Sequence, residues 1–343
     1  MLCKSLTGIG FLLFSVFLSP VYGTDLYSGT LVDAHSQVRC DIHPREVSKI
    51  VDKLPVDYVL LSAGGCNKKE EFFANLPTHL GRVAEVTLQS DKLFFMSGMK
   101  HLTVKSQWNP KFLKPIFSIG EQANYVGTAE ILIQHAVWDD PRLQSRGVNL
   151  NLLDPNLEVI IQQLKSRSLP VILHVEFNDA SDLRDQTVDD LNVLLEEHSD
   201  HPFVLIHMGQ SSPELTASLL DQNNNLYFLT SMTSGFFQIV SRGKTFTTQS
   251  GWETFFKVEN KSLAEHMAKP SWRPEWLGVI NKHPTKFILA FDSVFKGNWR
   301  NRYPKELQII RRAFADLDPV KAKRIACGNA QKLWRLPIEC LAN

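Results

Sequence analysis

Short apolar runs alternate along the chain with longer segments of helical periodicity. Such runs are typical of parallel strands that are buried on both faces, and the periodic segments are typical of the helices that cover them. The predicted strands cover residues 29–35, 57–63, either 82–88 or 114–119, 126–133, 170–175, 203–207, 225–231 and 286–292. This repeated alternation of strand and helix predicts an α/β fold, specifically a (β/α)8 TIM barrel.

The predicted helices cover residues 44–54, 154–166, 181–198, 213–220 and 304–317. No low-complexity tract or Gly/Ser linker divides the chain after its first residues, so we expect residues 24–343 to form a single domain. The stretch 232–283 is longer than the other connections and rich in aromatic residues. Long loops are usually functional, and this one is either an extra pair of helices or a lid over the substrate.

The first residues have the pattern of a secretory signal peptide. Lys4 precedes an apolar stretch over residues 9–18, and small or apolar residues lead to Gly23. The apolar stretch is about ten residues long, whereas a membrane-spanning helix needs roughly twenty. We therefore expect residues 1–23 to be removed and the protein to be exported, periplasmic or secreted, without a membrane anchor.

Composition excludes one class of partner. The chain has 37 basic and 36 acidic residues, a formal net charge of +1. It therefore lacks the basic excess that neutralises a run of phosphates, and nucleic acid is not an expected partner. We expect a small-molecule substrate; the oligomeric state stays open. The cysteines that remain after signal removal match no zinc motif, and both disulfides and buried thiols stay open for them: Cys40, Cys66, Cys327 and Cys340.

Ionisable residues stand at the carboxyl ends of the predicted strands, where a barrel places its chemistry: His35, Glu130, His174, His207 and Asp292. A single histidine at such a position is usually packed in the core, but agreement among several strand ends favours a site. Imidazole and carboxylate together suit a divalent metal, with Zn²⁺ the best match. We expect these residues to converge on one ion, which would lower the pKa of a bound water, and a carboxylate beside that water could take its proton.

The ordered motifs resemble the amidohydrolase superfamily, closest to its amidohydrolase-related (amidohydrolase 2) branch. They are "LVDAHSQ", "VILHVEF", "VLIHMGQ", "FILAFDS" and "ACGNAQKLW", and they span residues 31–334. The resemblance implies a metal-dependent barrel in which His174 and His207 bind the ion and Asp292 moves the proton. Glu130 matches a strand where some branches place a metal-bridging glutamate or carboxylated lysine.

The first strand departs from the family pattern. The family usually ends this strand with His-x-His, whereas here the second position is Gln37. An amide oxygen is a neutral and weaker ligand, so we expect one ion rather than two. Gln37 could instead bind substrate by hydrogen bonds. Glu176 could either orient the imidazole of His174 or meet the substrate.

The main hypothesis is a metal-dependent hydrolase that cleaves an amide, ester or lactone. The alternatives are a metal-independent lactonase or decarboxylase of the same barrel family, and a binding protein whose catalysis has decayed. The presence of His174, His207 and Asp292 together argues against decay, because a purely structural barrel has no need of ionisable groups at three strand ends. The sequence does not identify the substrate.

Overall fold

The computed structural model describes residues 26–64, 69–97, 117–118, 124–135, 148–177, 184–231, 272 and 274–341, with no side-chain description for 69–78. Parallel strands form two sheets at its centre. The first has the order β1 (Val32–Val38), β2 (Tyr58–Ala63), β3 (Leu93–Ser97) and β4 (Tyr125–Thr128). The second has the order β11 (Phe287–Ile288), β10 (Leu226–Leu229), β9 (Phe203–Leu205), β8 (Val171–His174) and β5 (Ile131–Leu132).

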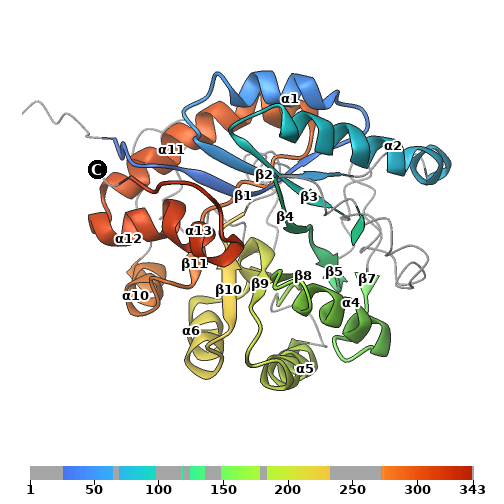
Figure 1. Ribbon diagram of the computed structural model, residues 1–343. Coiled ribbons are helices and arrows are strands. Elements are labelled where there is room, and N and C mark those ends of the chain that lie inside the picture. Colours follow the sequence, from blue (N-terminus) through green and yellow to red (C-terminus); the bar gives the residue numbers. More distant parts are fainter. Residues whose placement is uncertain are drawn as a thin grey trace, which may run out of the picture.

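The two sheets are joined on both sides. Only two residues separate β4 from β5, so one chain segment belongs to both sheets. On the other side, Ala34 N–H donates to Leu289 O at 3.0 Å and Asp292 N–H donates to His35 O at 2.7 Å. The strands therefore surround a common centre, and the helices lie outside them (Figure 1).

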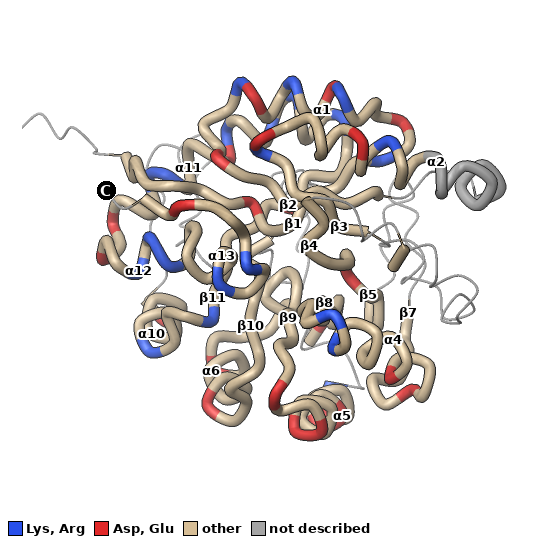
Figure 2. The backbone as a smooth tube through the Cα atoms, viewed as in Figure 1, with Lys and Arg blue, Asp and Glu red and all other residues tan. Residues whose placement is uncertain are grey.

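The covering helices follow the strands in chain order. They are α1 (Pro44–Val51), α2 (Lys69–Leu88), α4 (Pro155–Lys165), α5 (Arg184–Glu197), α6 (Pro213–Gln222), α10 (Pro274–Lys282) and α11 (Tyr303–Ala315), with α12 (Pro319–Lys323) and α13 (Asn329–Trp334) at the end. Charged residues lie mostly on these helices and their loops, whereas the strands are largely uncharged (Figure 2). Among the described helices, none has the length and apolarity to cross a membrane.

Local sequence signals explain where several helices begin. Asp154 caps α4 by accepting a hydrogen bond from Asn156 N–H at 2.9 Å, and Pro155 follows it. Ser212 caps α6 in the same way, again with proline as the next residue. A capping side chain satisfies one of the free N–H groups of the first turn, and proline suits the first helical position because it has no N–H to satisfy.

The centre of the strands is filled by one apolar cluster, to which every strand from β1 to β4 and from β8 to β11 contributes. Its strand residues are Val32, Ala34, Leu60, Phe94, Met96, Val126, Ile172, Val204, Leu229 and Ile288. Ala330 and Trp334 of α13 pack against the same cluster, so α13 covers one end of it. The disulfide Cys327–Cys340 spans this closing helix, and Cys40 is also disulfide-bonded.

Most predicted elements are confirmed, but the third strand was placed wrongly. Residues 82–88 belong to α2, and the strand is β3, Leu93–Ser97. The buried residues of this part of α2 include Leu80, Val83, Ala84 and Thr87, which have the spacing of a helix face. The alternative strand at 114–119 is described only at residues 117–118, which are helical. The small antiparallel pair β6 (Gln134–His135) and β7 (Val148–Asn149) was not predicted.

The long stretch 232–283 is described only at residue 272 and from residue 274 onward. The helix α10 occupies its end. The rest of this stretch, for which we expected either an extra pair of helices or a lid, lies outside the described residues.

Candidate functional site

The five predicted metal ligands lie together: His35 within β1, Glu130 between β4 and β5, His174 at the end of β8, and His207 and Asp292 after β9 and β11. His174 Nδ1 lies 3.0 Å from Glu130 Oε2, and the rings of His174 and His207 are 5.0 Å apart between centroids. His207 Nε2 lies 3.7 Å from Asp292 Oδ2, and His35 Nε2 lies 3.5 Å from Asp292 Oδ1. Each of the five is buried. The segments that carry them are far apart in sequence, and the strand order brings them to one point.

His174 lies between two carboxylates. Its Nδ1 faces Glu130 and its Nε2 faces Glu176 Oε1, both at 3.0 Å. Burial lowers the pKa of His174, but hydrogen bonds to the two carboxylates outweigh burial and raise the pKa to about 10. Burial raises the pKa of Glu130. The hydrogen bond from His174 and the charges of nearby imidazoles outweigh burial and lower the pKa to about 2. The pair therefore strongly favours its ionised form.

His207 has a fixed orientation. Its Nδ1 lies 2.9 Å from Ser231 O, a geometry in which Nδ1–H donates to the carbonyl. Its Nε2 then carries a lone pair directed toward Asp292. Burial, followed by the charge on His174, lowers the pKa of His207 to about 3. The result is a neutral imidazole with one nitrogen available to a metal ion, the form that metal binding requires.

The backbone at His207 is unusual. His207, Met208, Gly209 and Gln210 all have positive φ, between 48° and 60°, and form a buried left-handed turn directly after β9. Such a conformation costs roughly 1–2 kcal/mol per non-glycine residue. It persists because its surroundings fix it: Phe177 N–H donates to Gly209 O at 2.7 Å. Strain of this kind is concentrated at functional sites, where it aims a side chain.

Asp292 also has a left-handed backbone, with φ of 52°. Gln37 Nε2 donates to its Oδ1 at 2.9 Å, which leaves Oδ2 on the side of His207. Burial, reinforced by the charge on Glu130, raises the pKa of Asp292 well above its ordinary value. Asp292 is therefore a carboxyl group that holds a proton much more readily than an exposed aspartate.

His35 is fully buried, and neither of its ring nitrogens has a hydrogen-bond partner. Burial lowers its pKa, so the ring is neutral. Buried polar atoms without partners are rare in folded proteins, because each one loses its hydrogen bonds to water without replacement. The ring nitrogens of His35, beside the carboxylate of Asp292, are therefore available to a ligand.

Two groups of residues within the described part of the chain present metal-ligand atoms within 4.8 Å of one another. One consists of Glu130, His174 and His207, and the other of His135, His174 and Glu176. His135 was not predicted, although it comes two residues after the apolar run "ILI", a signal similar to that at the other strand ends. Its ring centroid lies 5.0 Å from that of His174.

Asp33 supports the site from behind, a role that sequence reasoning did not assign. It accepts hydrogen bonds from Tyr303 Oη at 2.8 Å, from Ser36 Oγ at 2.5 Å and from Phe291 N–H at 3.0 Å. These bonds connect β1 with the segment that leads to Asp292 and with α11. Burial raises the pKa of Asp33 to about 6 despite them.

Solved structures share this fold. A ligand-free protein from Agrobacterium tumefaciens is 12% identical over 90% of this chain and 97% of its own, with a TM-score of 0.51. An amidohydrolase from Burkholderia multivorans, solved with bound HEPES, is 11% identical over 90% of this chain and 100% of its own, with a TM-score of 0.52. Another crystal form of that amidohydrolase contains bound zinc and gives a TM-score of 0.51.

A TIM-barrel protein from Bordetella bronchiseptica is 11% identical over 89% of this chain and 98% of its own, with a TM-score of 0.50. These likenesses confirm the predicted α/β fold, a TIM barrel. No protein-family model matches the sequence, and no curated protein matches it.

Proposed function

We propose that this protein belongs to the amidohydrolase superfamily and is a metal-dependent hydrolase of an amide, ester or lactone. The observation that carries the proposal is the convergence of Glu130, His174 and His207, whose ligand atoms lie within 4.8 Å of one another. Nitrogen and carboxylate oxygen suit a divalent metal, with Zn²⁺ the best match. The ordered motifs of the sequence and the fold shared with the zinc-containing Burkholderia amidohydrolase support the same function.

Of the two groups of possible ligands, Glu130, His174 and His207 fit such an ion better than His135, His174 and Glu176 do. His207 is held with Nε2 free, and His35 Nε2, which has no hydrogen-bond partner, lies 3.5 Å from Asp292 Oδ1. An ion among Glu130, His174 and His207 would take the place of the proton on His174 Nδ1. His174 Nε2–H would then still donate to Glu176, which would orient the ring.

A bound ion would supply activated water and polarise the scissile carbonyl. Asp292 would accept the proton, because its Oδ1 is held by Gln37 and its Oδ2 faces the cluster. Burial makes the carboxylate of Asp292 a stronger base, and the charge of a bound ion would keep it ionised until it accepts the proton. Asp292 could also contribute an oxygen to the ion.

The role of Gln37 supports one ion rather than two. Its amide nitrogen faces Asp292, so this end of the amide is a donor and not a ligand. It thereby positions the carboxylate, and a substrate-binding role for Gln37 stays a hypothesis.

A metal-independent lactonase or decarboxylase in the same fold is the second candidate. One observation favours it: Glu130 and Glu176 stabilise His174 as a charged imidazolium, an acid that needs no metal.

A substrate panel separates the two candidates. Protein purified without chelator is assayed on amide, ester and lactone substrates before chelation, after chelation and after zinc is restored. The metal-dependent proposal predicts loss and recovery of turnover. Turnover that survives complete chelation supports the metal-independent candidate and contradicts the first.

A further inference from the structure

A hollow of about 670 Å³ opens at the end of the barrel opposite the candidate site. Its wall contains residues that directly precede strands, such as Pro202 before β9, Asn225 before β10 and Lys286 before β11. The candidate catalytic residues instead lie toward the carboxyl ends of the strands: His174 is the last residue of β8, and His207 and Asp292 come after β9 and β11. The hollow is therefore separate from that site, and its volume lies in the range of small-molecule sites.

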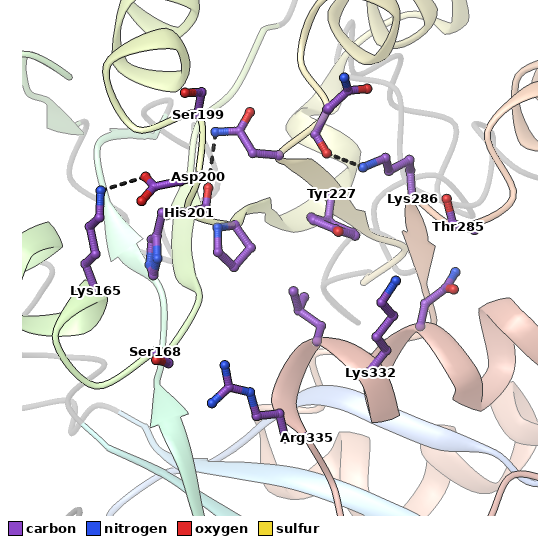
Figure 3. Close-up of a pocket in the computed structure, with 15 residues that line it drawn as sticks. Lys165, Ser168, Ser199, Asp200, His201, Tyr227, Thr285, Lys286, Lys332 and Arg335 are labelled. Atoms are coloured by element: carbon purple, nitrogen blue, oxygen red, sulfur yellow. Dashed lines mark hydrogen bonds and ion pairs between the residues drawn. The ribbon is translucent and has the colours of Figure 1, made fainter.

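Positive charge dominates this lining. The lining contains four cationic side chains, Lys165, Lys286, Lys332 and Arg335, but a single carboxylate, Asp200, which is paired with Lys165 at 2.6 Å. The other three cations have no carboxylate partner within the ranges that the structure describes. Figure 3 shows Lys286 and Lys332 on the right of the hollow and Arg335 below it, with Lys165 and Asp200 on the left.

Two of the unpaired cations act on one another. Burial, followed by the charge of Lys332, lowers the pKa of Lys286. The ammonium of Lys286 lies 4.3 Å from the centre of the Tyr227 ring and donates a hydrogen bond to Asn224 O. Its position is therefore fixed, and the repulsion from Lys332 is unfavourable for the fold unless an anion is present.

The frame that carries the cations is rigid. Asn225 Nδ2 donates to three backbone carbonyls at 2.9 to 3.1 Å, and Asn329 Nδ2 donates to two at 2.7 and 2.9 Å. The disulfide Cys327–Cys340 encloses the segment that carries Lys332 and Arg335. A site held in this way loses little entropy when it binds a ligand.

Helix ends explain only part of the charge. Lys165 and Lys332 lie in the last turns of α4 and α13, where a cation stabilises the helix dipole by about 0.3–1 kcal/mol. Lys286 belongs to no helix, so the helix dipole does not account for its position. It lies close enough to Lys332 for the two positive charges to repel one another. Tyr227 and Leu333 add an apolar surface to the lining.

We propose that this hollow binds a small molecule with a tetrahedral oxyanion, a phosphate or sulfate monoester. The three unpaired cations, Lys286, Lys332 and Arg335, complement the oxyanion. Tyr227 and Leu333 contact the organic part of the ligand. This binding is independent of the hydrolytic site, because no residue is shared.

Isothermal titration of the purified protein at low salt tests this site with pyrophosphate, inorganic phosphate and sulfate as probes. The variant Lys332→Gln/Arg335→Gln is compared with Lys323→Gln/Arg324→Gln, a matched loss of charge at neighbouring residues that do not line the hollow. We expect the first variant to weaken pyrophosphate binding at least tenfold and the second to leave it nearly unchanged. Added salt should weaken binding to the unsubstituted protein.

Comparison of the phosphate and sulfate probes identifies the preferred oxyanion. Absence of binding to the unsubstituted protein would overturn the proposal. So would undiminished binding to the first variant, or an equal loss in both variants. None of these outcomes bears on hydrolysis, since the substitutions leave the candidate site intact.

Discussion

Asp292 combines a left-handed backbone, a buried carboxyl group and a hydrogen bond from Gln37. If it accepts the proton in the reaction, Asp292→Asn keeps the shape of the side chain and removes the base. We expect turnover to fall by about 10²- to 10⁴-fold. Steady-state rates and metal content are measured on the same preparation. Metal lost together with rate would identify Asp292 as a ligand, and unchanged turnover would contradict the mechanism.

Substitution of Glu176 tests how strongly metal binding by His174 depends on the orientation of its ring. Glu176→Gln replaces a carboxylate 3.0 Å from His174 Nε2 with a neutral amide. Partners of this kind orient ligands and raise their basicity, so we expect metal affinity to fall by about 10- to 100-fold. Competition with a zinc indicator measures the affinity.

The matched control for this substitution is Glu158→Gln, which alters a Glu–His pair of 2.9 Å with His198 outside the site. It should leave metal affinity unchanged. An equal loss of metal affinity in the two variants would show that Glu176 does not orient His174.

At the residue scale, the sequence predicted which side chains converge but not how each is held. His35, Glu130, His174, His207 and Asp292 follow apolar runs, and parallel strands bring such positions together. The choice between Nδ1 and Nε2 depends on carbonyls and carboxylates from other segments, which no local pattern reveals. For the same reason the support that Asp33 gives through Tyr303 was not predicted.

Among the elements, α11 carries a buried acid that makes stability depend on pH. Burial raises the pKa of Glu306 to about 7, and one of its oxygens has no partner. The folded state thus holds this proton more tightly than the unfolded state, whose value is near 4.5. The stabilisation is present below pH 4.5 and is lost as the pH rises through 7.

Glu306→Gln has no such proton to lose. The unsubstituted protein loses stability as the pH rises from 5 to 8, and this variant does not. The free energy of unfolding of the variant minus that of the unsubstituted protein should therefore increase by roughly 2 kcal/mol between pH 5 and pH 8. Urea unfolding at the two pH values measures this difference, with exposed Glu214→Gln as control. A difference that does not change with pH would show that Glu306 is already ionised at pH 5 in the folded state.

The elements also show where periodicity is ambiguous. The helix starts at Pro155 and Pro213 were predictable because a capping residue and proline act locally. The segment 82–88 was taken for a strand because its apolar residues are dense, whereas the helical face emerges only when Leu80 is included. The strand β3, Leu93–Ser97, is then reached after a turn of a few residues.

For the whole molecule, export stays a prediction from the signal-peptide pattern of residues 1–23. We expect the exported form to begin near Thr24. Mass spectrometry of the secreted or periplasmic protein measures its amino terminus. An uncleaved terminus in the membrane fraction would contradict the signal peptide.

The barrel as a whole was predictable from the order of strands and helices, because the alternation permits few other arrangements. The unpaired cations at its other end were not predictable, because Lys286, Lys332 and Arg335 come from segments that meet only after folding. Length and composition alone gave neither feature.

The central claim is a metal ion held by Glu130, His174 and His207. Elemental analysis of protein purified without chelator measures metal per chain, beside His174→Ala/His207→Ala and the control His198→Ala/His283→Ala, whose histidines pair with carboxylates elsewhere. Circular dichroism confirms that each variant is folded. The account predicts about one equivalent of zinc-like metal in the unsubstituted protein and the control, and almost none in the first variant. Metal retained by that variant, or two tightly held ions in the unsubstituted protein, would contradict it.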